Sequence, residues 1–393
     1  MAPTPRPKAR RRRWRTLAAA LLGALALAAL ATTPAARRGH EALLILFDIQ
    51  AGTGPSRLKH RTRDPLRSAV DFRILGRDHQ ADRYQPADRA PRATLVLLHG
   101  LTPAGRREPR LERFATTLAR AGFRVVVPDL PGMRSLAVGT EDVRDIADTL
   151  RQVLGRTGNP DCNAVGLMGF SFAVGPALIA ALTADVGERL SFVVAVGGYY
   201  DLTGAITYAT TGYDPLSGQR GTPPAPEGKW WLLQSESRRL TRLEDRALLD
   251  QLAQRRTRDP AAPVDDLLVP LSRDGRAVYA LAANTDPERV RDLIRQLPAE
   301  IRTQLHALDL AQQKLETLRA HLLLIHGTED NVIPVGHSRA LLARLGTARA
   351  SLFEAGGLNH VDVAPGLRDA FQLWRATREL LWLADGGARE PAC

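Results

Sequence analysis

Ser171 has the sequence surroundings most typical of a catalytic residue in this chain. The apolar stretch 163–170 ends in the pattern Gly-x-Ser-x-Ala and continues into small residues that are compatible with a helix. A strand that turns sharply into a helix holds a serine at the turn where a base can take its proton and backbone N–H groups can meet an oxyanion. Gly169 and Ala173 flank the serine where larger side chains would collide in a tight turn. The pattern predicts a nucleophile.

Two further polar residues follow predicted strands downstream and complete a catalytic set. Asp330 comes shortly after the run 321–325, and His360 follows the run 350–354 on a loop that contains two glycines. Each of Ser171, Asp330 and His360 therefore stands after a predicted strand. We expect His360 to act as the general base for Ser171, and Asp330 to fix the imidazole tautomer and stabilise the imidazolium.

Other residues compete for these roles. Glu329 is adjacent to Asp330, and Asp201 is a second candidate for the acid because it follows the predicted sixth strand. His99 and His326 each stand at a strand end before a glycine, where we expect them to shape the turn and not to catalyse.

An oxyanion loop is expected after the apolar run 93–98, which leads into His-Gly-Leu-Thr. The N–H groups of Phe172 and of Leu101 or Thr102 would bind the oxyanion. The predicted reaction is acyl transfer from a small-molecule substrate to water, with an ester as the expected bond. A peptidase or an acyltransferase can use the same triad, and a catalytically silent, membrane-tethered binding module is the alternative outside catalysis.

The elements that must position these residues alternate between strands and helices. An entry hairpin is predicted from Val70, followed by helices at 111–121 and 140–154 and strands at 123–127 and 192–196. This alternation is typical of a doubly wound, mostly parallel sheet that is covered on both faces.

The sequence resembles the α/β-hydrolase superfamily from about Val70 to Trp382, with a long interruption in the middle. The residues that carry the resemblance are the serine turn, the order serine, aspartate, histidine, and the Pro-Asp-Leu-Pro-Gly turn at 128–132. Ala173 stands where glycine is commonest, and Met-Arg-Ser at 133–135 replaces the frequent His-Gly-x-Ser. The resemblance implies an α/β-hydrolase fold with serine esterase or lipase-like activity, without indicating a subfamily.

The chain is expected to contain one hydrolase core with an insertion. The core comprises residues 70–200 and 319–386, and a helical cap at 201–318 lies between the sixth and seventh strands, where this family commonly carries a lid. Five aromatic residues there could line an acyl pocket or, as is more usual, pack a small helical core: Trp230, Trp231, Tyr199, Tyr200 and Tyr208.

The N-terminus is predicted to direct export. Seven basic residues precede residue 16 with no acid before Glu41, and they account for more than half of the formal net charge of +12, so this charge does not indicate a nucleic-acid partner. The apolar run 17–31 follows, so residues 1–36 form a signal peptide, cleaved near Ala35 or Ala36, or a membrane anchor. Arg12 and Arg13 also allow a twin-arginine signal. We expect the catalytic domain on the non-cytoplasmic side, and we favour membrane retention.

Residues 37–69 are expected to be a linker or juxtamembrane segment. Within it, the apolar patch 42–49 is too short to span a bilayer and contains Asp48, so we expect it to pack on the domain or to lie along the bilayer surface. With only Cys162 and Cys393 the sequence has no disulfide framework and no metal-ligand spacing. We expect Cys162 to be buried at the start of the serine strand, and we expect neither a metal nor another cofactor.

Overall fold

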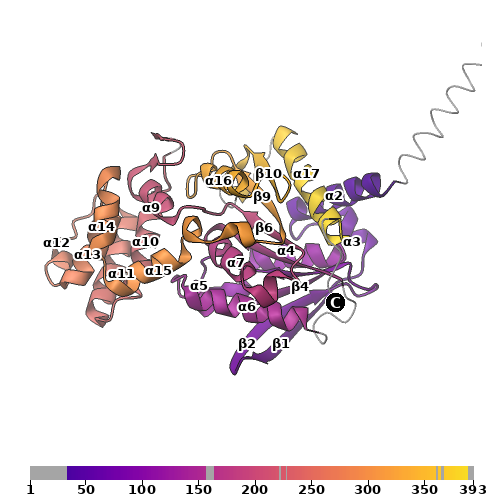
Figure 1. Ribbon diagram of the computed structural model, residues 1–393, viewed down its shortest axis with the longest axis horizontal. Helices are drawn as coiled ribbons and strands as arrows, with labels where there is room; N and C mark the ends of the chain where they lie inside the picture. Colours follow the sequence, from indigo (N-terminus) through magenta and orange to yellow (C-terminus); the bar gives the residue numbers. More distant parts are fainter. Residues whose placement is uncertain are drawn as a thin grey trace, which may run out of the picture.

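The central sheet has eight strands in the order β1-β2-β4-β3-β5-β6-β9-β10. The computed structural model (Figure 1) describes residues 33–155, 163–220, 223–226, 228–359, 362–363 and 367–387. Strand β1 pairs antiparallel with β2 and β2 with β4, whereas the strands from β4 to β10 run parallel. The strands are β1 Leu66–Ile74, β2 Arg77–Gln85, β3 Ala93–Leu97, β4 Phe123–Pro128, β5 Ala164–Phe170, β6 Phe192–Val196, β9 His321–Gly327 and β10 Ala350–Ala355.

Helices cover both faces of this sheet. Successive side chains of a buried strand point to opposite faces, so both faces are apolar and each is packed against helices. In β5, Val165 and Leu167 join one hydrophobic cluster, while Ala164 and Met168 join the other. The first cluster includes α6 Thr140–Leu154, α7 Val174–Ala181 and α16 Gly336–Leu345; the second includes α2 Pro34–Ala51, α4 Pro109–Arg120 and α17 Leu367–Ala384. The predicted doubly wound, mostly parallel architecture is confirmed.

The segment expected to be a linker is instead largely folded onto the domain. Thr33 caps α2, its side chain accepting a hydrogen bond from the N–H of Ala36, and a short helix α3 Arg57–Arg61 follows before β1 begins at Leu66. Helix α2 lies beside α17 (Figure 1). The Gly, Pro and basic residues of this stretch suggested a linker, but the apolar face of α2 is buried by residues distant in sequence.

Asp48 anchors α2 from within its apolar patch. The carboxylate is buried and accepts hydrogen bonds from the hydroxyls of Ser56 and Thr117, and the Nζ of Lys59 lies 3.0 Å away. Burial opposes ionisation, but these hydrogen bonds and the lysine charge hold the pKa of Asp48 below its usual value. The patch is therefore a helix packed on the domain, one of the two arrangements expected for it.

Seven helices lie between β6 and β9 in the described part of this insertion, and they extend the molecule at one end (Figure 1). Of the aromatic residues expected here, Trp230, Tyr199 and Tyr208 are buried, and the Tyr199 hydroxyl donates to the carbonyl of Leu308 at 3.0 Å, whereas Trp231 is 44% exposed. The helices are α9 Leu202–Thr211, α10 Gly228–Ser237, α11 Leu243–Arg258, α12 Asp265–Leu268, α13 Arg273–Ala282, α14 Val290–Gln296 and α15 Ala299–Leu308.

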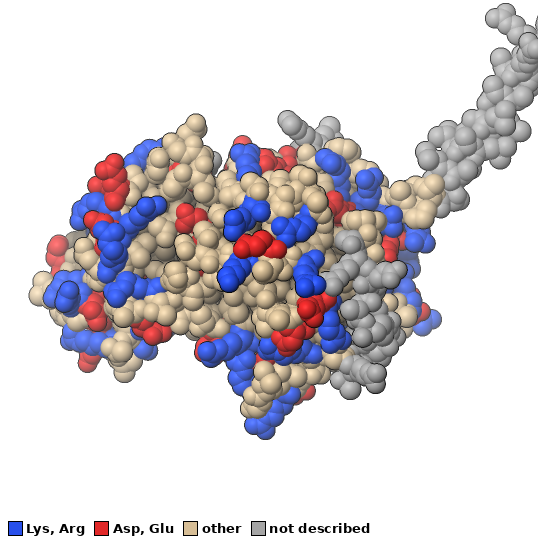
Figure 2. Space-filling view, in the orientation of Figure 1, with Lys and Arg blue, Asp and Glu red and all other residues tan. Residues whose placement is uncertain are grey.

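Acidic and basic side chains are interspersed over the face shown in Figure 2. Among the described residues, no helix is both long enough and apolar enough to cross a membrane. The apolar run 17–31, Cys162 and Cys393 lie outside the described residues.

Candidate active site

Ser171 occupies a sharp turn between β5 and α7. Its φ is 53°, a left-handed value that residues other than glycine rarely adopt. The 3-10 turn Ser171–Ala173 begins at this residue. A Cβ built on Gly169 would lie 3.3 Å from the carbonyl carbon and oxygen of Ala173, so the turn has little room for a larger residue. This is the strained strand-to-helix geometry that the Gly-x-Ser-x-Ala pattern predicts.

The loop after β3 runs beside the end of β5. The N–H of Leu98 donates to the carbonyl of Met168 at 2.9 Å, so the expected oxyanion loop leaves β3 at the edge of the sheet at which β5 ends. His99 is buried behind this loop: its Nδ1 donates to the carbonyl of Gly100 at 2.9 Å, and its Nε2 accepts from the N–H of Leu130 at 3.2 Å.

His99 consequently joins the turn after β3 to the turn after β4. Burial lowers the pKa of His99 and so favours the neutral ring that this hydrogen-bond pattern requires. The ring shapes the turn, as expected from the sequence.

Asp330 lies on the loop that follows β9, at the same edge of the sheet as Ser171, because β5 and β9 are parallel neighbours of β6. The side chain is buried, and its Oδ1 accepts from the N–H groups of Val332 and Ile333, both at 2.9 Å. These two bonds hold the carboxylate in one orientation.

The residues that compete for the roles of acid and base lie in environments different from that of Asp330. Glu329 is exposed. Asp201 caps α9, its Oδ1 accepting from the N–H of Gly204 at 2.9 Å. His326 is buried; its Nε2 donates to the carbonyl of Ile333 at 2.8 Å and lies 3.5 Å from Oδ2 of Asp330, so it too shapes the loop.

The predicted base, His360, lies outside the described residues. The structure describes the chain up to Asn359 and again at residues 362–363. Strand β10 ends at Ala355, whose carbonyl accepts from the N–H of Thr328 at 3.1 Å, and the short strands β11 Leu358–Asn359 and β12 Asp362–Val363 pair with each other. The structure thus brings Ser171 and Asp330 to one edge of the sheet, and the chain leading to His360 leaves β10 at that edge.

His337 is a buried residue of this region that the sequence did not single out. Its Nδ1 accepts from the N–H groups of Tyr200 and Asp201, at 3.1 and 3.3 Å, and so links α16 to the start of α9. Burial lowers the pKa of His337 to about 4, which keeps the ring neutral. A lone histidine near a helix start has no local signal for such a role, since its partners are 136 and 137 residues away in the chain.

The insertion touches the loop that carries Asp330. The N–H of Ala225 donates to the carbonyl of Asn331 at 2.8 Å, and a Cβ built on Gly336 would lie 3.2 Å from Oδ2 of Asp214. Among the described residues, no group of histidine, cysteine, aspartate or glutamate side chains could hold a metal ion.

Residues 95–371 match the alpha/beta hydrolase family. The strained serine turn and the order of the strands agree with this match, and the chain belongs to the alpha/beta hydrolase family.

Solved structures give further matches. An acylaminoacyl peptidase of Pyrococcus horikoshii is 13% identical with a TM-score of 0.48, over 85% of this chain and 43% of that one. A hypothetical protein, PA2218, of Pseudomonas aeruginosa is 18% identical with a TM-score of 0.44, over 81% of this chain and 94% of that one. A cold-adapted esterase from an Arctic intertidal metagenomic library is 13% identical with a TM-score of 0.42, over 81% of this chain and 93% of that one. The chain spans about two fifths of the length of the first peptidases it matches.

Proposed function

We propose that this alpha/beta hydrolase is a serine hydrolase that cleaves carboxylic esters through Ser171, His360 and Asp330. The observation that carries the proposal is the φ of 53° at Ser171, at the end of a buried strand. Strain of this kind costs about 1–3 kcal/mol and persists where surrounding structure imposes it, which is a property of functional sites. The family match from residue 95 to residue 371 supports hydrolysis as the reaction class.

In the proposed mechanism, His360 removes the proton of Ser171 as its oxygen attacks the ester carbonyl. Asp330 holds the imidazole and offsets its positive charge, and the N–H groups of Phe172 and of Leu101 or Thr102 bind the oxyanion. The alcohol leaves with the proton from His360. A water molecule, deprotonated by the same base, then releases the acid from the acyl-enzyme.

We propose that the insertion between β6 and β9 acts as a lid over this edge of the sheet. The hydrogen bond from Ala225 to Asn331 supports the proposal, because Asn331 directly follows the proposed acid. The buried ring of Tyr199 lies 6.0 Å from that of Phe172, so the acyl pocket would lie at the border between the insertion and the core.

The test measures hydrolysis of nitrophenyl esters of graded chain length, together with the matching anilides, by wild type, Ser171→Ala, His360→Ala and Ser68→Ala. Ser68 lies on the hairpin strand β1 and is the matched control. We expect Ser171→Ala and His360→Ala to lose about 10³-fold or more in kcat, and the double variant to be little worse, because triad members act as a unit. The control should keep wild-type activity.

A fluorophosphonate probe separates the alternatives. Labelling that is kept in Ser68→Ala and lost in Ser171→Ala supports a nucleophilic serine, and its loss in His360→Ala as well supports activation by that histidine. Faster cleavage of the anilides would favour a peptidase, and acyl transfer to added alcohol in place of water would favour an acyltransferase. Absence of both labelling and turnover in wild type would favour a silent binding module and contradict the proposal.

We also propose that the protein is exported and remains attached to the membrane, with the catalytic domain on the non-cytoplasmic side. The basic residues before residue 16 and the apolar run 17–31 support export. Retention is supported by helix α2, because cleavage near Ala35 or Ala36 would remove the Thr33 cap and cut the first helical turn. Membrane fractionation with intact-mass measurement tests this: a soluble species that begins after residue 34 would exclude the anchor, and a full-length soluble cytoplasmic protein would exclude export.

A further inference from the structure

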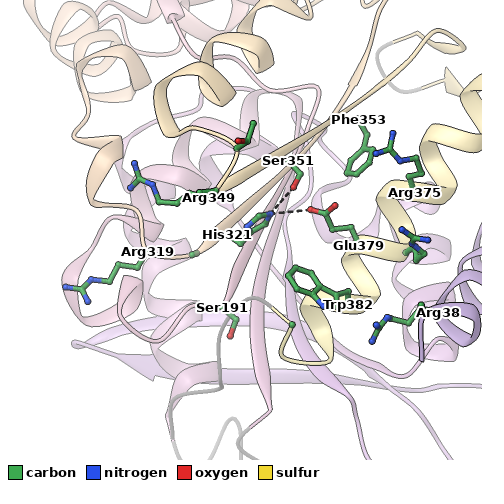
Figure 3. A pocket seen from close by; sticks show the side chains of 16 residues that line it. Arg38, Ser191, Arg319, His321, Arg349, Ser351, Phe353, Arg375, Glu379 and Trp382 are labelled. Atoms are coloured by element: carbon green, nitrogen blue, oxygen red, sulfur yellow. Dashed lines mark hydrogen bonds and ion pairs between the residues drawn. The ribbon is translucent and has the colours of Figure 1, made fainter. Parts of the chain in front are cut away.

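A cavity of about 720 Å³ lies at the edge of the sheet opposite to Ser171. Its walls come from the starts of β9 and β10, from α17 and from the first turns of α2, where Ala35 and Arg38 line it. Figure 3 shows His321 and Glu379 reaching toward each other near the middle, with Arg319 and Arg349 on one side and Arg38 and Arg375 on the other.

The polar cluster at the centre of this cavity is not a second catalytic triad. Nε2 of His321 lies 3.1 Å from Oγ of Ser351 and 3.3 Å from Oε1 of Glu379. A triad histidine uses one ring nitrogen for the serine and the other for the acid, so that a proton taken at one is stabilised from the other. Here a single nitrogen serves both partners, so the cluster holds the cavity wall in place.

The arginines around this cluster have few anionic partners. Arg349 donates to the carbonyls of Leu345 and Glu316 at 3.3 and 2.7 Å, and Arg375 to the amide oxygen of Gln372 at 3.3 Å. The cations of Arg375 and Arg378 also lie over aromatic rings, at 5.2 and 5.1 Å.

Among the described residues, carboxylates offset only part of the charge of Arg319, Arg349, Arg375 and Arg378. Within the described ranges, Glu188, 3.9 Å from Arg319, is the only carboxylate that forms an ion pair with one of these four guanidinium groups, and the charge of Glu379 also acts on Arg375. Asp385 pairs with the fifth arginine, Arg38, at 3.3 Å, and the carboxylate of Glu379 is engaged by His321. Five arginines line the cavity, and four of them therefore have little compensation from the described carboxylates.

We propose that this cavity binds the phosphate group of a phosphate ester. Guanidinium groups donate paired hydrogen bonds that match phosphate oxygens, and stacking on aromatic rings holds them ready for an anion. The volume is typical of sites for small organic ligands, and Phe353 and Trp382 in the wall offer apolar surface for the rest of the molecule.

Two sources present this chemistry: the headgroup of an anionic lipid, or a soluble phosphate ester. The lining by the first turns of α2 points to the lipid, because the proposed membrane segment precedes this helix. The phosphate site itself does not depend on the proposed catalytic role of Ser171.

Calorimetric titration of the full-length protein in a neutral detergent tests the proposal. The probes are glycerol phosphate and dihexanoyl phosphatidic acid. The variant Arg375→Gln/Arg378→Gln removes two exposed guanidinium groups that lie over rings and donate to no backbone carbonyl of the described residues. The matched control is Arg289→Gln/Arg291→Gln, which removes two exposed charges from the insertion. Arg319→Gln is a second, single variant in case the double variant fails to fold.

We expect wild type to bind at least one probe. Arg375→Gln/Arg378→Gln should bind that probe at least about tenfold more weakly, since charge-assisted hydrogen bonds are lost. The control should stay within about twofold, because distant exposed charges are screened by salt. Tighter binding of the lipid assigns the headgroup as the ligand, and equal or tighter binding of glycerol phosphate assigns a soluble ester. No saturable binding of either probe, or an equal loss in the control, would overturn the proposal.

Discussion

Replacing His337 with asparagine is expected to change how the stability of the protein depends on pH. The pKa of this buried histidine is lowered to about 4 in the folded state, against a usual value of 6.5 in an unfolded chain. Between these two values the unfolded state binds more protons than the folded state, so the free energy of unfolding rises with pH. The stabilising effect of the neutral ring is complete above about pH 6.5 and is lost as the pH falls toward 4.

The size of the effect follows from the two pKa values. A difference of roughly 2.5 units corresponds to about 3 kcal/mol once the pH is below both values, and about 2 kcal/mol of this is lost between pH 7 and pH 5. His337→Asn removes the titrating group, while the amide oxygen of asparagine can still accept hydrogen bonds from the N–H groups of Tyr200 and Asp201.

Urea unfolding at pH 7 and pH 5 measures this effect. The free energy of unfolding of wild type should fall by about 2 kcal/mol more than that of His337→Asn between these pH values. The exposed His306 provides the matched control, and His306→Asn should follow the wild-type curve. Parallel curves for wild type and His337→Asn would refute the reasoning, because the buried ring would then not resist protonation.

Two further predictions concern the acid and the packing beneath the serine turn. Asp330→Asn should lower kcat for ester hydrolysis by about 10²–10⁴-fold, because the neutral amide does not offset the imidazolium charge. Asp201→Asn should keep a kcat within about tenfold of wild type. A larger loss in Asp201→Asn than in Asp330→Asn would move the acid to Asp201. Gly175→Ala should lower the free energy of unfolding by about 1–3 kcal/mol, because its methyl would lie 1.8 Å from the Tyr199 hydroxyl. Urea unfolding tests this with Gly228→Ala, where nothing lies within 4 Å, as the control; equal stability of the two variants would contradict it.

The elements of the core could be predicted from the sequence because their signals are local. Buried strands of a parallel sheet appear as continuous apolar runs, and helices with one buried face as apolar residues three and four apart. The tight turn at Ser171 also has a local cause, since Gly169 and Ala173 are small where the backbone of the turn comes close. The family resemblance therefore led to the correct fold class.

The position of α2 required the tertiary structure, because its burial depends on residues distant in sequence. Asp48 is held by Thr117, 69 residues away, and Trp374 of α17 donates to the carbonyl of Gly39, 335 residues away. No window of sequence contains both partners of such a contact.

The sequence by itself determined the alternation of strands and helices, the serine turn and the order of the candidate triad along the chain. Only the tertiary structure decided that His337 links α16 to the insertion, and that arginines from α2, from the segments just before β9 and β10, and from α17 line one cavity. The physical reason is that a backbone turn is governed by its immediate neighbours, whereas burial and charge depend on which distant segments the fold brings together.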